Sequence, residues 1–539
     1  MNKIFLPLQM ILLSASVAVG QMFFTLPEVA DTYFVINFGR YILENGFPYV
    51  DPFTIHENLK LVAQQWLSGI FIWEAYKNFG INGLRFTDFI CGAALVLIHW
   101  RLCLFVSGGN KALSFVLSFA VGLVVTPLIV PRPQIFSTLL LLGEVFLLEK
   151  FTRTKDFKFL LPLPFISVAL INFHAAIWLM SLVVCVPFLF VKDFRHAKFL
   201  LAAMAGIFFG GLINPYGLDA MTYVFRSYGI DLINKNISEM FTPTAHNLRG
   251  KFFYFAEALL IFSLAKFKVP WRYILLSGGI TFMAIMHVRN QILFYSLATF
   301  PIAYAWRNFQ SKIFSKFQLL PTLIFFLLVL ANTAFITTLL NDALEKLSVP
   351  LEILLLASVL FILYNLLVLK FEGRLLHPTI LPQKNLSLFV TALIVGGIFL
   401  TTLDTSNKDS DGNFAVAMKY LLRSERPENI LLYADQGYGG LAGMFGIRYY
   451  IDSRSEVFLP ANNGQKNIFA EYLDFSAGKI NYKDFFSRYK FTHIFITSEE
   501  PFIFDSLTND KNFRTIYESE RVDGYKVIRY KIFVPKNEE

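Results

Sequence analysis

Apolar runs of about 14 to 23 residues recur along most of this chain, and they constrain its fold more than any other feature. A helix of about 20 apolar residues spans the hydrocarbon core of a bilayer and satisfies its own backbone hydrogen bonds. The chain is therefore predicted to be a polytopic α-helical membrane protein. We place about thirteen transmembrane helices near residues 5–24, 83–104, 111–130, 134–149, 158–174, 176–191, 197–213, 252–265, 272–286, 289–306, 318–340, 351–369 and 386–403.

Composition agrees with this prediction. Of the 539 residues, 55% are hydrophobic and 16% are charged, whereas globular chains carry about 25% charged residues. A soluble fold could not bury that much apolar surface. The net charge of +9 does not indicate a nucleic-acid partner, because Lys and Arg are spread through short loops instead of forming a stripe. The three cysteines, Cys91, Cys103 and Cys185, lie inside apolar runs and show no disulfide or metal spacing.

The alternation of basic loops predicts how the chain is oriented. One set of loops is rich in Lys and Arg, whereas the alternate short loops hold only Arg132, Arg289 and Lys346. Basic loops stay in the cytoplasm, so the N-terminus is predicted to be cytoplasmic. With an odd number of spans, the C-terminal segment then lies outside. We therefore expect a multi-pass protein of the plasma membrane.

Three outward segments are long enough to fold. Residues 1–403 are predicted to form the transmembrane domain, with outer loops over 25–82 and 214–251, and 404–539 a soluble extracytoplasmic α/β domain. The first outer loop has two amphipathic stretches, 31–44 and 66–79, which predict short helices on the membrane surface. In the tail, helix-like stretches near 465–478 and 482–489 alternate with strand-like runs at 430–434, 449–452, 493–497 and 525–533.

Polar residues gather at the outer ends of the predicted spans. Arg132, Asn172, His174, Tyr216 and Arg289 all lie there, and they could converge on one cavity open to the outside. Arginine binds phosphate through two parallel hydrogen bonds, so such a cavity would suit an anionic ligand. Each residue also has a structural interpretation. The arginines could extend to lipid headgroups, the histidine could pack between helices, and the sequence around the tyrosine could form a turn.

The first outer loop holds the candidate carboxylates. Asp31 follows the first span directly and Glu28 precedes it by three residues, so the pair could hold a divalent metal. Asp31 could also accept a proton from an attacking hydroxyl, or it could simply cap the surface helix. Gln65 directly precedes the second surface helix and Trp66 begins it, so the tryptophan could anchor this helix at the membrane interface.

These residues resemble the GT-C superfamily of membrane glycosyltransferases, which includes protein mannosyltransferases and oligosaccharyltransferases. The similar stretches are DTYF at 31–34, GR at 39–40, GFP at 46–48, DPF at 51–53 and QWL at 65–67. The whole layout is similar, but the motifs cover only about a quarter of the chain. Two features differ from the family. The acidic residues after the first span are not adjacent, and DQGYG at 435–439 lacks the tryptophans of the oligosaccharyltransferase acceptor motif.

The resemblance implies an enzyme that transfers a sugar from a polyprenyl-phosphate donor to an envelope glycan, lipid or protein at the outer face of the membrane. It implies that Asp31 is the catalytic or metal-linked carboxylate, with Mg²⁺ or Mn²⁺ as the metal. Arg132, His174 and Arg289 would then contact the donor phosphate. Gln65 and Trp66 would line the entrance of the cavity. A transporter or flippase of a lipid-linked or anionic solute stays open as an alternative, as does a non-catalytic envelope assembly protein.

Reporter fusions test the orientation. A reporter that is active only outside the cytoplasm should be active when fused after Asn407 and inactive when fused after Lys155, because the positive-inside rule assigns these residues to opposite sides. Activity at Lys155 with silence at Asn407 would reverse the topology and move every candidate site residue to the cytoplasmic side.

Overall fold

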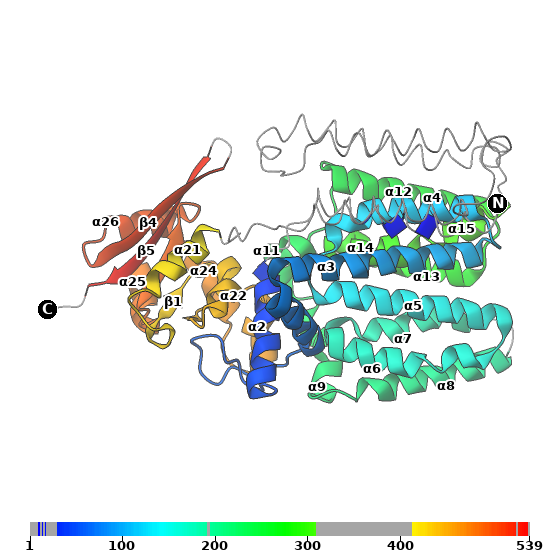
Figure 1. The fold of residues 1–539 in the computed structure, drawn as a ribbon, viewed down its shortest axis with the longest axis horizontal. Coiled ribbons are helices and arrows are strands. Elements are labelled where there is room, and N and C mark those ends of the chain that lie inside the picture. The colour runs from blue at the N-terminus through cyan, green and yellow to red at the C-terminus, as the bar shows by residue number, and fades with distance from the viewer. Residues whose placement is uncertain are drawn as a thin grey trace, which may run out of the picture.

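The computed structural model describes residues 9–10, 13–14, 17, 30–190, 194–308, 412–523 and 526–536. Within these residues the chain forms a helical bundle and a sheet domain, with helix α2 (Ala30–Asn45) between them (Figure 1). The predicted spans at 318–340, 351–369 and 386–403 lie outside the described residues, as does most of 5–24. The number of thirteen spans therefore stays a prediction.

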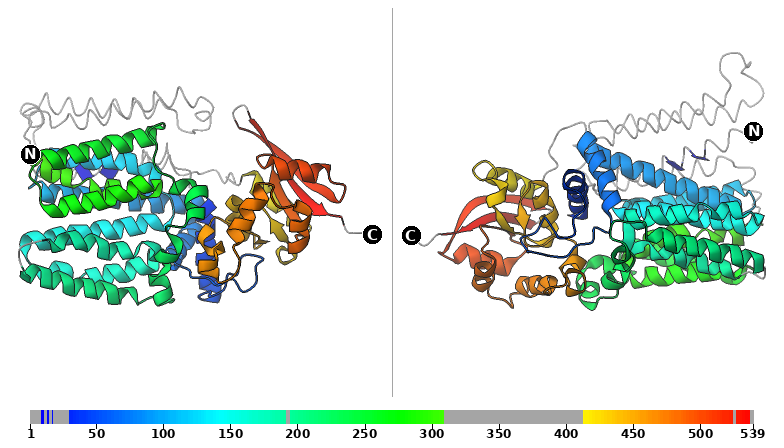
Figure 2. Two further views of the ribbon diagram at one scale, coloured as in Figure 1. Left: turned by 180° about the vertical axis from the view of Figure 1, so that it is seen from behind. Right: turned by 90° about the horizontal axis from the view of Figure 1, so that it is seen from below.

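The bundle helices run side by side over most of their length (Figures 1 and 2). Among the described residues, three helical segments are long and apolar enough to cross a membrane, namely Trp66–Val106, Lys111–Leu128 and Phe157–Ile177. This is consistent with a membrane location. The bundle consists of α3 (Trp66–Val106), α4 (Lys111–Val125), α5 (Pro133–Thr154), α6 (Leu163–His174), α7 (Leu179–Cys185), α8 (Phe194–Gly211), α12 (Leu248–Lys266), α13 (Trp271–Met286), α14 (Gln291–Leu293) and α15 (Pro301–Ala305).

Two helical segments cross the end of the bundle that faces the sheet domain. Helix α3 bends at Gly80, where φ is 58° and ψ is −144°, a conformation that glycine tolerates. The bend separates a short helix over 66–79 from the span that follows, as the sequence predicted. Helix α2 packs against this short helix at Gly39, where an added Cβ would lie 2.0 Å from the Gly69 carbonyl oxygen. Because Gly39 and Gly69 have no side chains, α2 can pack close to the bundle at this crossing.

The second outer loop folds into short helices beside this end of the bundle. They are α9 (Leu218–Met221), α10 (Tyr223–Ser227), α11 (Asp231–Asn236) and the 3₁₀ turn η5 (Ser238–Met240). The η5 turn is fixed to the bundle through the 3₁₀ turn η6 (Val288–Asn290), since His287 Nδ1 lies 2.7 Å from the Met240 carbonyl oxygen and Val288 N–H donates to Phe241. The loop therefore has a defined position over the outer ends of the helices.

The tail forms a five-stranded mixed sheet in the order β2-β1-β3-β5-β4. Strands β1, β2 and β3 are parallel, and β5 pairs antiparallel with β3 and β4. Four strands and two helices agree with the sequence prediction, whereas β4, rich in charged residues, was missed. The elements are α21 (Asn413–Leu421), β1 (Leu431–Tyr433), α22 (Gln436–Met444), β2 (Arg448–Tyr449), η9 (Ser455–Phe458), α23 (Pro460–Asn463), α24 (Ile468–Ser476), α25 (Tyr482–Tyr489), β3 (His493–Thr497), α26 (Pro501–Asn509), β4 (Phe513–Asp523) and β5 (Lys526–Pro535).

The sheet domain shares a hydrophobic core with the first outer loop. Phe34 and Phe38 of α2 are buried in the same cluster as Tyr450 and Phe458 of the tail. Polar contacts fix the position of α2 relative to α22 of the tail. Asn37 Nδ2 donates to the Gly440 carbonyl at 2.7 Å, and the Arg40 guanidinium donates to the carbonyls of Gly443 and Met444 at the end of α22. Helix α2 therefore donates side-chain hydrogen bonds to carbonyls in the last two turns of α22.

The centre of this contact is the buried guanidinium of Arg454. Its Nη1 lies 2.7 Å from Asp51 Oδ1 in the first outer loop, and its Nη2 lies 2.7 Å from Asp452 Oδ2. All three side chains are almost fully buried. Four phenylalanine rings surround the cation at 5.2 to 5.9 Å, contributed by both parts of the molecule, namely Phe34, Phe38, Phe53 and Phe458. This ion pair joins the tail to the first outer loop across the shared core.

Replacing Asp51 with Asn should strongly destabilise the attachment of the tail. Asp452 still neutralises the Arg454 cation in this variant, but the charged hydrogen bond from Arg454 to the first outer loop is lost, and such a bond contributes about 1.5–3 kcal/mol. Calorimetric unfolding of the purified protein would measure the loss as a lower midpoint temperature.

Asp219→Asn is the matched control. Asp219 also pairs with the first outer loop, at 3.1 Å from Lys60, but both side chains are about half exposed, and such pairs contribute about 0–1 kcal/mol. Equal midpoints for the two variants would mean that the Arg454 pair does not hold the tail in place.

Candidate functional site

A cavity of about 460 Å³ lies where α2, the outer ends of the bundle helices, the second outer loop and the tail meet. Its walls on the bundle side come from the starts of α2 and α5 and from η6. Its wall on the tail side comes from the segments that follow β1 and β2, at 435–437 and 453–456. Ligand sites in open parallel sheets lie at the carboxyl ends of the strands, and the two tail segments occupy that position.

One wall of the cavity is a three-membered ion network. Arg132 comes immediately before Pro133, the first residue of α5, which places its guanidinium at the outer end of the bundle. Its Nη1 lies 3.0 Å from Asp31 Oδ2 and 2.6 Å from Glu239 Oε1. Arg132 is nearly buried, with 11% of its side chain exposed. It therefore bridges two carboxylates inside the protein and does not extend to lipid headgroups.

Arg289 of η6 is the second cation of the cavity, and it has no carboxylate within ion-pair distance among the described residues. Its guanidinium carbon lies 5.4 Å from the centroid of the Tyr228 ring, and its Nη1 lies 3.9 Å from Met240 Sδ. Neither partner carries a formal charge. A cation in this position can accept an anionic ligand without first losing an ion pair.

The carboxylates of the cavity differ in their surroundings. Burial by itself raises the pKa of Glu239, but Arg132 and Arg289 outweigh it and hold that pKa below its usual value. Burial also raises the pKa of Glu456, and there the opposing effects of its own backbone N–H, Arg289 and the Tyr223 hydroxyl are too small to reverse it. Glu239 is therefore a fixed negative charge, whereas Glu456 is the more basic group.

The tail contributes two carboxylates without an ion pair among the described residues. Asp435 precedes α22 and accepts hydrogen bonds from the Gly437 N–H and the Tyr472 hydroxyl. Glu456 lies in η9 and accepts one side-chain hydrogen bond, from the Tyr223 hydroxyl to Oε1 at 3.2 Å. Asp435 is thus committed to capping α22, and Glu456 keeps one oxygen free.

Several polar atoms around the cavity are buried without a hydrogen-bond partner among the described residues. Buried polar groups are almost always paired in native proteins, so this concentration indicates a polar ligand or ordered water. The unpaired lining atoms include Arg132 Nε, Gln134 Oε1, Ser227 Oγ, Gln436 Oε1, Ser453 Oγ and Ser455 Oγ.

Five of the predicted site residues line this one cavity: Asp31, Gln65, Arg132, His174 and Arg289. The ring of His174, at the end of α6, lies 3.1 Å from the Ser137 hydroxyl through Nδ1. Their convergence agrees with the expectation that the polar outer ends share a space. Their roles in substrate binding and catalysis stay predictions.

The other three predicted substrate-binding residues lie outside the lining and connect outer helix ends. Trp66 Nε1 donates to Asn172 Oδ1 at 2.8 Å, and the Asn172 amide donates to the Ile213 carbonyl at 2.8 Å. Tyr216 donates its hydroxyl to the Pro48 carbonyl at 2.8 Å. These contacts give each residue a structural partner, which favours the packing and turn interpretations over contact with a ligand.

The helix-cap interpretation of Asp31 does not fit the structure, because α2 begins at Ala30 and Asp31 lies inside its first turn. The predicted metal does not fit the described side chains either. Asp31 faces the cation Arg132 at 3.0 Å, and no three His, Cys, Asp or Glu side chains converge among the described residues. Glu28, the second predicted ligand, lies outside the described residues. We derive no step through a metal.

Sequence reasoning missed the residues of the second outer loop and the tail, above all Tyr223, Glu239 and Glu456. A signal for the tail residues was present, since two predicted strands each end in a segment with acidic residues, at 435 and at 452–456. No comparable signal marks Glu239, which sits in an irregular loop. Its position depends on the contacts of η5 with η6.

Comparison with known proteins gives structural matches only. No family model and no curated protein matches the sequence. One similar solved structure is the oligosaccharyltransferase of Archaeoglobus fulgidus tethered to an acceptor peptide, with 12% identity, a TM-score of 0.45, and coverage of 92% of this chain and 69% of that one. The same enzyme in complex with zinc and sulfate matches at 10% identity and a TM-score of 0.44, over 90% and 67% of the chains.

Proposed function

We propose that this chain is a membrane glycosyltransferase that takes a sugar from a polyprenyl-phosphate donor and transfers it to a cell-envelope acceptor at the outer face of the membrane. The observation that carries the proposal is the position of Arg289. It is a cation without an ion pair among the described residues, in a polar cavity at the end of an apolar bundle. A phosphate on a lipid would reach it from the membrane side, with its sugar among the unpaired polar atoms.

The charges of the cavity suit this chemistry. In the transfer, the acceptor oxygen attacks the anomeric carbon, the bond from that carbon to the phosphate oxygen breaks, and its electron pair leaves with the phosphate. Arg289 stabilises the charge that develops on the phosphate. Asp31, held in place by Arg132, presents a negative charge to the sugar ring, which becomes partly positive in the transition state of glycosyl transfer.

The two buried glutamates of α5 do not favour transport. Transporter sites lie near the membrane midplane, between broken helices. Glu144 of α5 accepts hydrogen bonds from Ser181 and Cys185, and Glu149 accepts two from Arg272. Neither glutamate lines the cavity. Both have partners within the bundle, so a solute pathway does not explain them better than helix packing does.

Asp31→Asn should lower turnover by about 100-fold or more, because the amide removes the negative charge that would stabilise the transition state. Donor affinity should stay nearly unchanged. Sugar transfer from a set of purified polyprenyl-phosphate sugars, with a cell-envelope extract as acceptor, measures the effect. Asp231→Asn is the control, since that carboxylate is exposed and pairs with Lys235 four residues on. Full activity of the Asp31 variant at normal protein level would remove Asp31 from the mechanism.

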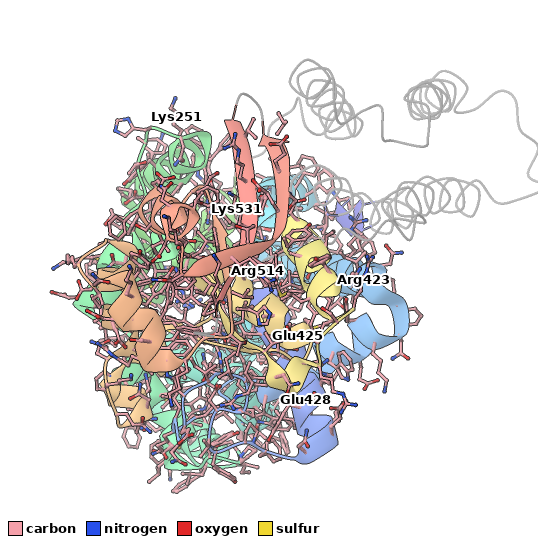
Figure 3. All side chains as sticks on the ribbon, turned by 90° about the vertical axis from the view of Figure 1, so that its left-hand side faces the viewer. Lys251, Arg423, Glu425, Glu428, Arg514 and Lys531 are labelled. Atoms are coloured by element: carbon pink, nitrogen blue, oxygen red, sulfur yellow. The ribbon has the colours of Figure 1, made fainter. Side chains whose placement is uncertain are left out.

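Arg289→Ala should weaken binding of polyprenyl phosphate by about 10- to 100-fold, which is what one charge-assisted hydrogen bond contributes. Arg289→Lys should recover part of the affinity. Titration of the lipid in nanodiscs measures the change. Arg423→Ala, on the exposed face of the sheet domain (Figure 3), is the control. An unchanged dissociation constant for the Arg289 variant would contradict the donor site.

A further inference from the structure

We propose that Glu456, contributed by the tail, is the catalytic base that takes the proton from the acceptor hydroxyl. This inference rests on the proposed glycosyl transfer and adds to it the assignment of the proton. In that step the acceptor O–H bond breaks, the proton moves to the Glu456 carboxylate, and the acceptor oxygen forms its bond to the anomeric carbon. The leaving phosphate keeps the electron pair of the broken bond.

The first support is the arrangement of the carboxylates. Asp31 and Glu239 share the Arg132 guanidinium at 3.0 and 2.6 Å, so a proton on either would weaken an ion pair. Asp435 accepts two hydrogen bonds at the start of α22. Glu456 accepts a side-chain hydrogen bond from Tyr223, has no cation at ion-pair distance among the described residues, and lies on the cavity lining. Of these four carboxylates, Glu456 is the one that can accept a proton without weakening an ion pair or a helix cap.

The second support is the way Glu456 is held. It lies in the short 3₁₀ turn η9, whose backbone is fixed by the Asn462 amide donating to the Glu456 carbonyl at 2.9 Å. The Tyr223 hydroxyl of α10 is buried and donates to Oε1, which leaves Oε2 for an acceptor. A general base needs this fixed geometry, with a free oxygen directed to the reacting group.

The third support is the charge environment of Glu456. Four charged or titratable groups face it: Tyr223 of α10, Arg289 of η6, Asp31 of α2, and Arg454 two residues before it. Arg454 is already neutralised by Asp51 and Asp452. Burial and the negative charge of Asp31 raise the pKa of Glu456, while Arg289 and Tyr223 lower it. Two carboxylates on opposite walls thus have different surroundings, since Asp31 contacts the Arg132 guanidinium and Glu456 contacts no cation at ion-pair distance among the described residues.

The test uses Glu456→Gln in the full-length protein. The amide can still accept the hydrogen bond from Tyr223, so the fold and donor binding should persist. Turnover should fall by about 100- to 10,000-fold, the contribution expected of a general base. The KM for the donor should change by less than about twofold. Glu428→Gln, an exposed position on the face of the tail shown in Figure 3, is the matched control and should keep full activity.

The pH dependence of the rate in a second variant distinguishes a catalytic role of Glu456 from a structural one. A base must be ionised to act, so the rate should rise with pH through the pKa of Glu456. Tyr223→Phe removes the hydroxyl whose hydrogen bond lowers that pKa, so the rise should move to higher pH while the plateau rate stays similar. In Glu456→Gln the rise should disappear from the residual activity.

The outcomes separate the two proposals. If the wild-type protein transfers sugar and Glu456→Gln keeps its rate and pH profile, Glu456 is not the base and the proposed function stands. An unmoved profile in Tyr223→Phe also overturns the assignment. If the wild-type protein binds no polyprenyl phosphate and transfers no sugar from any donor, both proposals fail together.

Discussion

The buried ion pair between Arg454 and Asp51 is the interaction on which the candidate site depends. It joins two segments 403 residues apart in sequence, with the Arg454 Nη1 donating to the Asp51 carboxylate at 2.7 Å. Because the pair is surrounded by phenylalanine rings, it cannot be replaced by water when it breaks. The same tail segment carries Glu456 into the cavity. The site is therefore complete only when the tail is packed against the first outer loop.

The bundle side and the tail side of the cavity carry different charged groups. On the bundle side, Arg132 holds two carboxylates, and Arg289 is left without one among the described residues. On the tail side, Glu456 meets the hydroxyl of Tyr223. An anion would be attracted to Arg289, and a neutral hydroxyl group would meet the unpaired serines and Glu456. This division suits a reaction in which a charged leaving group and a neutral acceptor enter from opposite walls.

Much of the fold could be predicted from the sequence, because hydrophobic runs and strand patterns are local signals. The helix over 66–79, strand β3 and helix α25 were all predicted closely. Strand β4 was missed because its alternating charges resemble a solvated loop. Arg132, His174 and Arg289 were expected to share a cavity because they lie at outer helix ends, and all three line it. Asn172 and Tyr216 were included by the same argument and lie outside the lining, because each is held by a neighbouring helix end or turn. The ion pair of Arg454 with Asp51 could not be predicted, because it depends on how two separate parts pack.

The central claim is that the outer loops and the tail together form one site for a polyprenyl phosphate. It can be measured directly by photo-crosslinking with a polyprenyl phosphate that carries a diazirine on the isoprene unit next to the phosphate. The account predicts labelled peptides from both the second outer loop around Glu239 and the tail around Glu456. Excess unlabelled lipid should suppress both labels. Labelling confined to the membrane-facing sides of the bundle helices, and unaffected by competing lipid, would contradict the account.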